Sequence, residues 1–273
     1  GEGEKIIEDF MIAANETVAE RIFWLELASI YRTHEKPDRE KIVKLNEILA
    51  KFGYKIPNFD NIHPKQFQEI IERSRDKETS MLVHKTILTS LKQARYTVED
   101  IGHFGLASSH YTHFTSPIRR YPDLQIHRII KENIRNGLSG RRIEHYRNIL
   151  DDVALQSSKM ERRAEEAERE TVKYKKCEYM LNHIGEEFDG IISGVTSFGI
   201  FVELENTVEG FIRMSDLEGD YFEYNEAGYE LVGEFTKKKF VLGQKVRVKV
   251  YDIDRLAKRI DFKLVKEKNG RGY

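Results

Sequence analysis

The spacing of apolar residues changes near Gly185, and this change constrains the fold more than any other feature of the chain. Before it, apolar residues recur at steps of three and four, the period of a helix with one buried face. After it, segments such as residues 246–250 alternate between apolar and basic side chains, the period of a half-buried strand. The sequence therefore predicts an α+β protein: a largely helical domain over residues 1–183, a β-rich domain over 184–266 and a basic tail over 267–273.

The helical half is predicted to contain six helices. The buried stripe of the first is expected to consist of Ile7, Phe10, Met11, Ala14 and Val18, and that of the second of Ile42, Leu45, Leu49 and Phe52. Pro37 and Asp38 offer a start and a cap for the second helix, and Gly53 offers a stop. Further helices are expected near residues 64–75, 78–94, 117–136 and 141–181. The last is rich in opposite charges at i,i+4 spacing, which is typical of a solvent-facing helix.

The second half is expected to form a small closed barrel. Five short alternating segments, separated by Gly, Asn and Ser turns, occur within about eighty residues. The five-stranded OB-fold is the common barrel of this size, and it binds oligonucleotides.

The most informative motif is Ser116-Pro117-Ile118-Arg119-Arg120. Serine before proline predicts a helix start, with Ser116 as the cap and Pro117 at the first position. The apolar residues of this helix that are expected to turn inward are Ile118, Leu124, Ile126, Ile129 and Ile130. Two arginines in a first turn oppose the helix macrodipole, which favours negative charge there. Either they hold an anion such as a phosphate, or they pair with carboxylates such as Asp123 or the glutamates of the first helix.

Residues 111–124, followed by His127-Arg128, resemble the signature near the end of the catalytic domain in the ribonuclease II/ribonuclease R family. Residues 7–16, 31–37 and 103–106 resemble other family segments in the same order, and the barrel resembles the S1-type RNA-binding domain. The resemblance covers nearly the whole chain. It implies a processive 3′→5′ exoribonuclease that hydrolyses single-stranded or structured RNA to nucleoside 5′-monophosphates with Mg²⁺.

The resemblance also implies roles for residues of the helical half. Arg119 is expected to clamp a phosphate near the scissile bond, as the catalytic contribution of this chain. The expected contacts with RNA in the catalytic channel are Glu8 at the ribose 2′-hydroxyl, Ser116 and Arg120 beside the clamp, Tyr121 packed behind it, and Glu168. In the family the aspartates that hold Mg²⁺ lie upstream of the segment matching residues 7–16. The chain alone is therefore expected to bind no metal and to be inactive.

In the barrel, aromatic and basic residues are the expected RNA contacts. Phe198 and Phe201 are predicted to offer a ring for stacking on a base, whereas Phe211 is predicted to be core. Arg213 can stack and add charge. The remaining predicted contacts are Tyr221, which lies with Phe222 and Tyr224 in a long connection, and the phosphate ligands Lys258 and Arg259.

Composition limits the other possibilities. The net charge is −1, so an RNA site must come from local clustering rather than from overall charge. No apolar run is long enough to span a membrane, no signal peptide is evident, and the single cysteine, Cys177, forms no internal disulfide. These features predict a cytoplasmic protein without a membrane partner.

No metal site is expected within the chain. His103, His110, His113 and His127 lack a compact ligand spacing, and Asp151-Asp152, Glu165-Glu166 and Asp252 with Asp254 are predicted to be surface charges. The expected partners are single-stranded RNA, the remaining part of the same enzyme, and the ribosome or the RNA-degradation machinery. Two other functions remain open: a stand-alone RNA-binding protein without hydrolytic activity, and a pure interaction scaffold.

Overall fold

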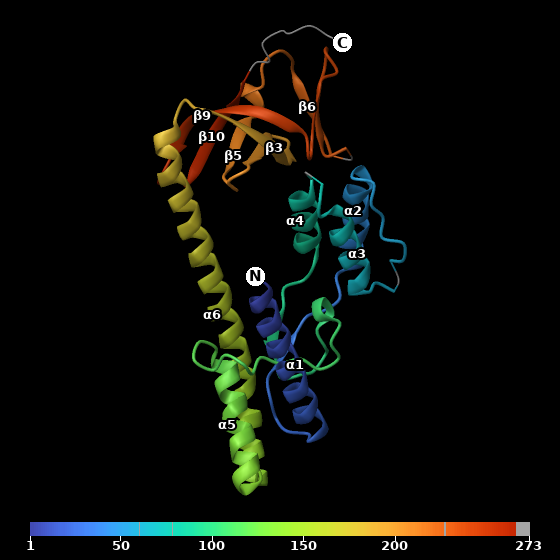
Figure 1. The fold of residues 1–273 in the computed structure, drawn as a ribbon, viewed down its shortest axis with the longest axis vertical. Helices are drawn as coiled ribbons and strands as arrows, with labels where there is room; N and C mark the ends of the chain where they lie inside the picture. The colour runs from blue at the N-terminus through green and yellow to red at the C-terminus, as the bar shows by residue number, and fades with distance from the viewer. Residues whose placement is uncertain (60, 78, 227, 266–273) are drawn as a thin grey trace. The chain divides into compact units, whose positions relative to one another are not determined.

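The computed structural model describes residues 1–59, 61–77, 79–226 and 228–265 (Figure 1). The predicted basic tail, residues 267–273, lies outside this part. The chain forms two compact units, Gly1–Ala164 and Glu165–Tyr273. Helix α6 (Gly140–Met180) contributes to both units. The predicted α+β class, helical first and β-rich second, is confirmed.

The first unit is built around three long helices. Helix α5 (Tyr121–Asn136) packs through Ile126 against Ala19 and Ile22 of α1 (Glu2–Trp24), and through Ile129 against the first part of α6. Two short antiparallel strands, β1 (Tyr31–Thr33) and β2 (Arg95–Thr97), lie beside this core, and a 3₁₀ turn, η1 (Phe104–Leu106), follows β2.

The stripe predicted for α1 is only partly correct. Ile7 and Phe10 are 60% and 69% exposed, and the buried residues of this helix are Asn15, Ala19 and Ile22. The reason is that α1 packs against α5 through its second half, whereas the first half borders an open pocket. The apolar side chains of that half face this pocket or solvent instead of a core.

A three-helix group has a core of its own, formed by α2 (Arg39–Lys51), α3 (Pro64–Ser74) and α4 (Ser80–Ser90). The prediction for α2 is confirmed, because the helix follows Asp38, buries Ile42, Leu45 and Leu49, and is followed by Gly53 with φ +77°. The helices predicted near residues 64–75, 78–94 and 141–181 are also present.

The helix predicted to start at Pro117 begins four residues later, at Tyr121. Residues 117–119 form a turn instead, in which the backbone N–H groups of Arg119 and Arg120 donate to the Ser116 carbonyl. Arg120 has extended backbone (φ −123°, ψ 115°), which interrupts any helix before it. Ile118, predicted to turn inward, is therefore fully exposed, whereas Ile126 and Ile129 are buried as predicted.

The predicted five-stranded barrel is confirmed. Its strands are β3 (Glu187–Thr196), β4 (Gly199–Leu204), β5 (Glu209–Arg213), β9 (Lys245–Asp254) and β10 (Arg259–Leu264), closed in the order β10-β5-β4-β3-β9. Alternate side chains point inward, among them Val202, Ile212 and Phe262. A Cβ at Gly210 would strike the Phe262 ring, so this glycine lets the ring fill the barrel. Short 3₁₀ turns, η2 (Leu181–His183) and η3 (Met214–Asp216), lie before β3 and after β5.

The connection between β5 and β9 was predicted without strands, but it forms a second sheet. Strands β6 (Phe222–Asn225), β7 (Glu230–Gly233) and β8 (Lys239–Val241) pair antiparallel. Phe222, Leu231 and Phe240 from this sheet join the barrel core. The strands have three or four residues each, too few to show a clear alternation in the sequence.

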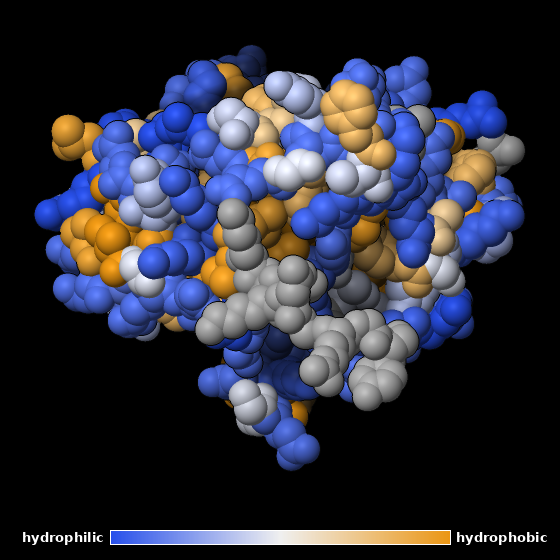
Figure 2. Space-filling model, turned by 90° about the horizontal axis from the view of Figure 1, so that it is seen from above, coloured by the Kyte–Doolittle hydropathy of each residue, from blue (hydrophilic) through white to orange (hydrophobic). Residues whose placement is uncertain are grey.

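Figure 2 shows hydrophilic side chains over most of the face viewed from above, with apolar side chains in separate groups. Among the helices of the described residues, none combines the length and the apolar character that crossing a membrane requires.

We expect Phe262→Ala to destabilise the barrel by about 3–5 kcal/mol, because it removes a buried ring from the centre of the core. Leu256→Ala is the control in the same unit, because that side chain is 96% exposed. Urea unfolding followed by circular dichroism measures both changes. Equal losses of stability in the two variants would contradict the described core.

Candidate nucleic-acid interface

A pocket of about 540 Å³ lies between α1 and the segment that precedes α5. One wall is a single face of α1, and the other comes from the region of η1 and residues 111–120. The lining residues are Gly3, Glu4, Ile7, Glu8, Met11, Ile12, Asn15, Leu106, Tyr111 and Arg120. The fold thus brings together Glu8 and Arg120, two of the predicted RNA contacts, on opposite walls. A volume of this size is within the range of small-molecule sites.

The second wall is an extended segment, residues 111–116, which is held on several sides. The Thr112 hydroxyl donates to the Ile30 carbonyl at 2.6 Å. The His127 ring stacks on Phe114 with 4.0 Å between centroids, and its Nε2 lies 2.9 Å from the Phe114 carbonyl oxygen. On the side of α1, the Asn15 amide bonds to both Tyr111 and Phe114. These contacts fix the position of the segment within the first unit.

Asp123 fixes the turn that carries the two arginines. Its carboxylate is completely buried, and Oδ1 accepts from the Ser116 backbone N–H at 2.8 Å and from the Arg120 guanidinium at 2.8 and 3.2 Å. The predicted Ser116 cap is therefore wrong, since Arg120 occupies the cap position. The pairing with Asp123, one of the alternatives from the sequence, holds for Arg120.

Arg119 differs from Arg120. Its side chain is exposed, and its guanidinium makes no ion pair or hydrogen bond with the residues described. Tyr121, predicted to pack behind the clamp, is half exposed, and the Arg128 guanidinium lies 5.9 Å from its ring centroid. Of the two arginines, Arg119 is the one whose donors are available to a phosphate.

On the side of Tyr96, residues 111–116 contact neutral histidines and an ion pair. The His113 Nδ1 lies 2.8 Å from the Tyr96 hydroxyl, and Arg32 lies over the Tyr96 ring and pairs with Glu161 at 2.6 Å. Burial, followed by the positive charges of Arg120 and Arg32, lowers the pKa of His113 to about 3. Burial and the neighbouring His34 lower the pKa of His103 to about 4. Both rings are therefore neutral at pH 7.

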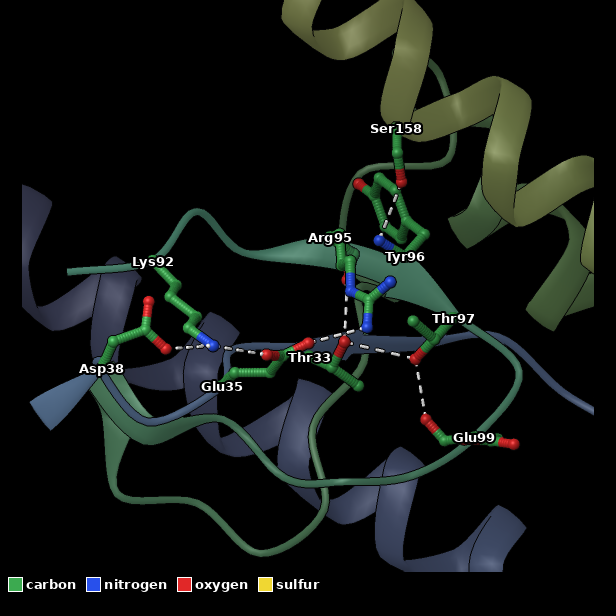
Figure 3. A network of polar contacts seen from close by, with 9 residues as sticks. All are labelled: Thr33, Glu35, Asp38, Lys92, Arg95, Tyr96, Thr97, Glu99 and Ser158. Atoms are coloured by element: carbon green, nitrogen blue, oxygen red, sulfur yellow. Dashed lines mark hydrogen bonds and ion pairs between the residues drawn. The ribbon is translucent and has the colours of Figure 1, made fainter.

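Hydrogen bonds connect strands β1 and β2 to each other and to α6, as Figure 3 shows. The Tyr96 backbone N–H donates to the Ser158 hydroxyl at 2.9 Å, and the Thr97 hydroxyl donates to Thr33 at 3.2 Å. Beyond the strand ends, Lys92 bridges Glu35 and Asp38 at 2.9 and 2.8 Å. These exposed pairs add little stability each, but the backbone bond to Ser158 locates Tyr96, and through it His113.

The described residues contain no group of three or more His, Cys, Asp or Glu side chains suited to a metal ion. His110 pairs with Asp100, and His127 stacks on Phe114, so each has a local partner. This donor set does not fit a Mg²⁺ centre.

Glu8 is exposed on α1, and Glu168 is exposed on the part of α6 that belongs to the second unit.

The barrel presents a cluster of three phenylalanine rings, Phe201 on β4, Phe211 on β5 and Phe198 in the turn before β4. Phe201 pairs in register with Phe211, their centroids lie 4.9 Å apart, and Phe198 lies 5.8 Å from Phe211. The prediction that Phe211 belongs to the core is wrong, because the strand alternation turns Gly210 and Ile212 inward and Phe211 outward. Phe198 is 60% exposed. The result is a ring surface suited to stacking.

The basic residues predicted to bind RNA near the barrel have carboxylate neighbours. Lys258 pairs with Glu170 of α6 at 2.5 Å, and Arg259 pairs with Asp261 at 3.0 Å. Arg213, which follows Phe211 by two residues, lies 3.6 Å from Asp261 and is half exposed. Arg213 is thus the cation least committed to a partner among these three.

Tyr221 lies next to the second sheet and is exposed beside Phe235, with 6.4 Å between ring centroids. The Asp220 carboxylate accepts from the backbone N–H groups of Tyr221, Phe235 and Thr236 and from the Thr236 hydroxyl. Against the opposing effect of desolvation, these bonds lower the pKa of Asp220 to about 2. The Asp220 carboxylate is therefore ionised over the physiological pH range, and its bonds join the backbone at Tyr221 to the backbone at Phe235.

Residues 1–136 match the RNB domain family, and residues 182–264 match the S1 RNA binding domain. Ribonuclease R 1 of Lactococcus lactis subsp. lactis is 43% identical over 263 residues, which cover 96% of this chain and 32% of that protein. The apo structure of Mycoplasma genitalium RNase R is 30% identical with a TM-score of 0.91, and its complex with ribose methylated single-stranded RNA has a TM-score of 0.89 at the same identity. Both matches cover 96% of this chain and 42% of the solved chain. The chain thus spans about a third of the length of the curated relative.

We expect Asp123→Asn to destabilise the first unit by about 1.5–3 kcal/mol, because the amide oxygen keeps the shape and can still accept these bonds, but the negative charge that strengthens them and pairs with Arg120 is lost. The control is Asp151→Asn, which changes an exposed carboxylate on α6. Thermal unfolding measures the difference. A variant as stable as the control would show that the Asp123 carboxylate does not hold the turn.

Proposed function

Since the chain belongs to the ribonuclease II/ribonuclease R family, we propose that it is the RNA-contacting part of a processive 3′→5′ exoribonuclease. The full enzyme would hydrolyse single-stranded or structured RNA to nucleoside 5′-monophosphates. The observation that carries the proposal is the pocket, because its two walls are formed by the segments that bear the family resemblance. In this proposal residues 1–183 serve the catalytic domain and residues 184–266 the S1 domain.

The pocket suits a ribonucleotide strand chemically. Arg119 does not line the pocket itself but directly precedes Arg120, which does. Its guanidinium, which pairs with none of the described residues, would donate two parallel hydrogen bonds to a phosphate at the edge of the pocket. Arg120, held by Asp123, would add positive charge at a fixed place in the wall. On the opposite wall, the Glu8 carboxylate can accept from a ribose 2′-hydroxyl, the group that distinguishes RNA from DNA.

Magnesium enters the proposal as the cofactor that the family implies. Since the described residues do not fit a site for it, no hydrolytic step is assigned to them. Their part is to bind the strand, fix its phosphates and orient its sugar. We propose accordingly that this chain alone releases no nucleotides.

The barrel would hold the incoming strand. Bases would stack on Phe198, Phe201 and Phe211, with Arg213 adding charge beside them. Tyr221 and Glu168 stay further proposed contacts, whereas Lys258 and Arg259 would have to exchange a carboxylate for a phosphate. A cytoplasmic location and contacts with the ribosome or the RNA-degradation machinery complete the proposal and rest on the family resemblance.

We expect the full-length protein to release nucleoside monophosphates from 3′-labelled single-stranded RNA with Mg²⁺, and this chain alone to release none. Arg119→Ala in the full-length protein should lower the rate by about 10²–10³-fold, as expected for removal of a preorganised donor to a charged transition state. Chromatography of the released nucleotides measures the activity of the full-length protein, of this chain alone and of the Arg119→Ala variant.

Two controls accompany this experiment. Arg119→Lys keeps the charge but loses the forked geometry, so it should recover part of the rate, and Arg147→Ala removes an exposed arginine outside the pocket. RNA binding by the full-length protein without nucleotide release would favour a stand-alone RNA-binding protein. Nucleotide release by this chain alone would overturn the assignment of the metal to other residues.

For the barrel, we expect Phe201→Ala to weaken binding of single-stranded RNA by this chain by about 1–3 kcal/mol, the value of one stacked base. Fluorescence anisotropy with a labelled oligonucleotide measures the dissociation constant, and circular dichroism checks the fold. Tyr179→Ala removes an exposed ring from α6 and serves as the control. An unchanged dissociation constant for Phe201→Ala would remove this ring from the interface.

A further inference from the structure

Asn15 and Tyr111 form a buried polar pair in the wall of the pocket. Asn15 lies in the middle of α1 and is 3% exposed, and Tyr111 belongs to the segment opposite. The Asn15 Nδ2 lies 3.0 Å from the Tyr111 hydroxyl oxygen, and the Asn15 Oδ1 lies 2.9 Å from the Phe114 backbone nitrogen. Both residues line the pocket, so the pair lies where a ligand would bind.

The backbone fixes the polarity of this pair. The Phe114 N–H can only donate, so the amide oxygen of Asn15 must face it. The amide nitrogen then faces Tyr111 and donates to its hydroxyl oxygen. A hydroxyl that accepts in this way keeps its own hydrogen for another acceptor.

No acceptor for that hydrogen occurs among the protein groups of the described residues. The nearest rings, His103 and His113, contact Tyr111 edge to face with centroids 5.2 and 5.9 Å away. The His103 Nδ1 accepts from the Leu106 N–H, and the His113 Nδ1 is bonded to Tyr96. The Tyr111 hydroxyl is thus a held donor without a protein acceptor among the described residues, and it belongs to a residue that lines the pocket.

We propose that the Tyr111 hydroxyl donates to a ribose or phosphate oxygen of the bound RNA strand, and that Asn15 is the positioning residue that aims it. The proposal rests on the proposed function of the pocket and adds a donor to it. Glu8 lies two helical turns from Asn15 on the same face of α1, roughly 10 Å along the axis. The wall would therefore offer a sugar–phosphate chain an acceptor and a donor at two successive places.

Two substitutions in the full-length protein test this inference. Tyr111→Phe keeps the ring and removes the hydroxyl. Asn15→Asp keeps an oxygen for the Phe114 N–H but replaces the amide nitrogen by an acceptor, which draws the Tyr111 hydrogen away from the pocket. Each should lower kcat/KM on single-stranded RNA at least tenfold, and the double variant should lose no more than the stronger single variant.

Tyr54→Phe is the matched control, because it removes a buried tyrosine hydroxyl that donates to the Arg73 carbonyl in the three-helix group, outside the pocket. Thermal unfolding of each variant separates folding from function. If wild-type protein releases no nucleotides, the proposed function fails. If wild-type protein is active and Tyr111→Phe stays within twofold of it, or if Asn15→Asp loses activity while Tyr111→Phe does not, the inference is overturned.

Discussion

The candidate interface depends on one buried carboxylate. Asp123 accepts from the Ser116 backbone and from Arg120, and these bonds close the turn that separates the extended segment from α5. They also give the two arginines different environments, because Arg120 is held in the pocket wall by its pair with Asp123 and the Arg119 side chain is exposed. Two adjacent guanidinium groups would oppose the helix macrodipole, and a carboxylate in the first turn offsets that cost. This arrangement leaves the Arg119 guanidinium without a partner among the described residues, beside the turn that Asp123 holds.

The local arrangement of donors, acceptors and aromatic rings explains how a chain with a net charge of −1 can be suited to RNA. In the first unit, donors and an acceptor face each other across one pocket. In the second unit, the rings of Phe201 on β4 and Phe211 on β5 lie beside that of Phe198 in the turn before β4, and base stacking on rings needs no large positive field. Several basic side chains that stand out in the sequence are committed to carboxylates of the protein, as Lys258 is to Glu170. The net charge therefore says little about the interface. The partner that each charged side chain has in the folded protein says more.

The fold could be predicted from the sequence where a signal is periodic over several turns or strands. Helix α2 and the five-stranded barrel are examples. The prediction was wrong where a distant partner decided the outcome. Phe211 was assigned to the core because its apolar character was visible but its register with Phe201 was not. Asn15 was missed as part of the site, although a polar residue within an apolar stripe was a signal for it. Asp123 was named only as one possible partner of the arginines, because the sequence could not show that its carboxylate is buried and also holds the Ser116 backbone.

By itself, the sequence determined the class of the protein, the order of its two halves, the family and the segment that carries the arginines. These follow from local periodicity and from residue order, which need no knowledge of contacts between distant segments. Only the tertiary structure decided that α1 faces the segment of Tyr111 and that a tyrosine hydroxyl is held as a donor in the pocket wall. It also decided that, among the described residues, Arg120 has a carboxylate partner and Arg119 has none. Hydrogen bonds between residues about a hundred positions apart, such as Asn15 and Tyr111, depend on how the chain folds back on itself, and no local pattern encodes that.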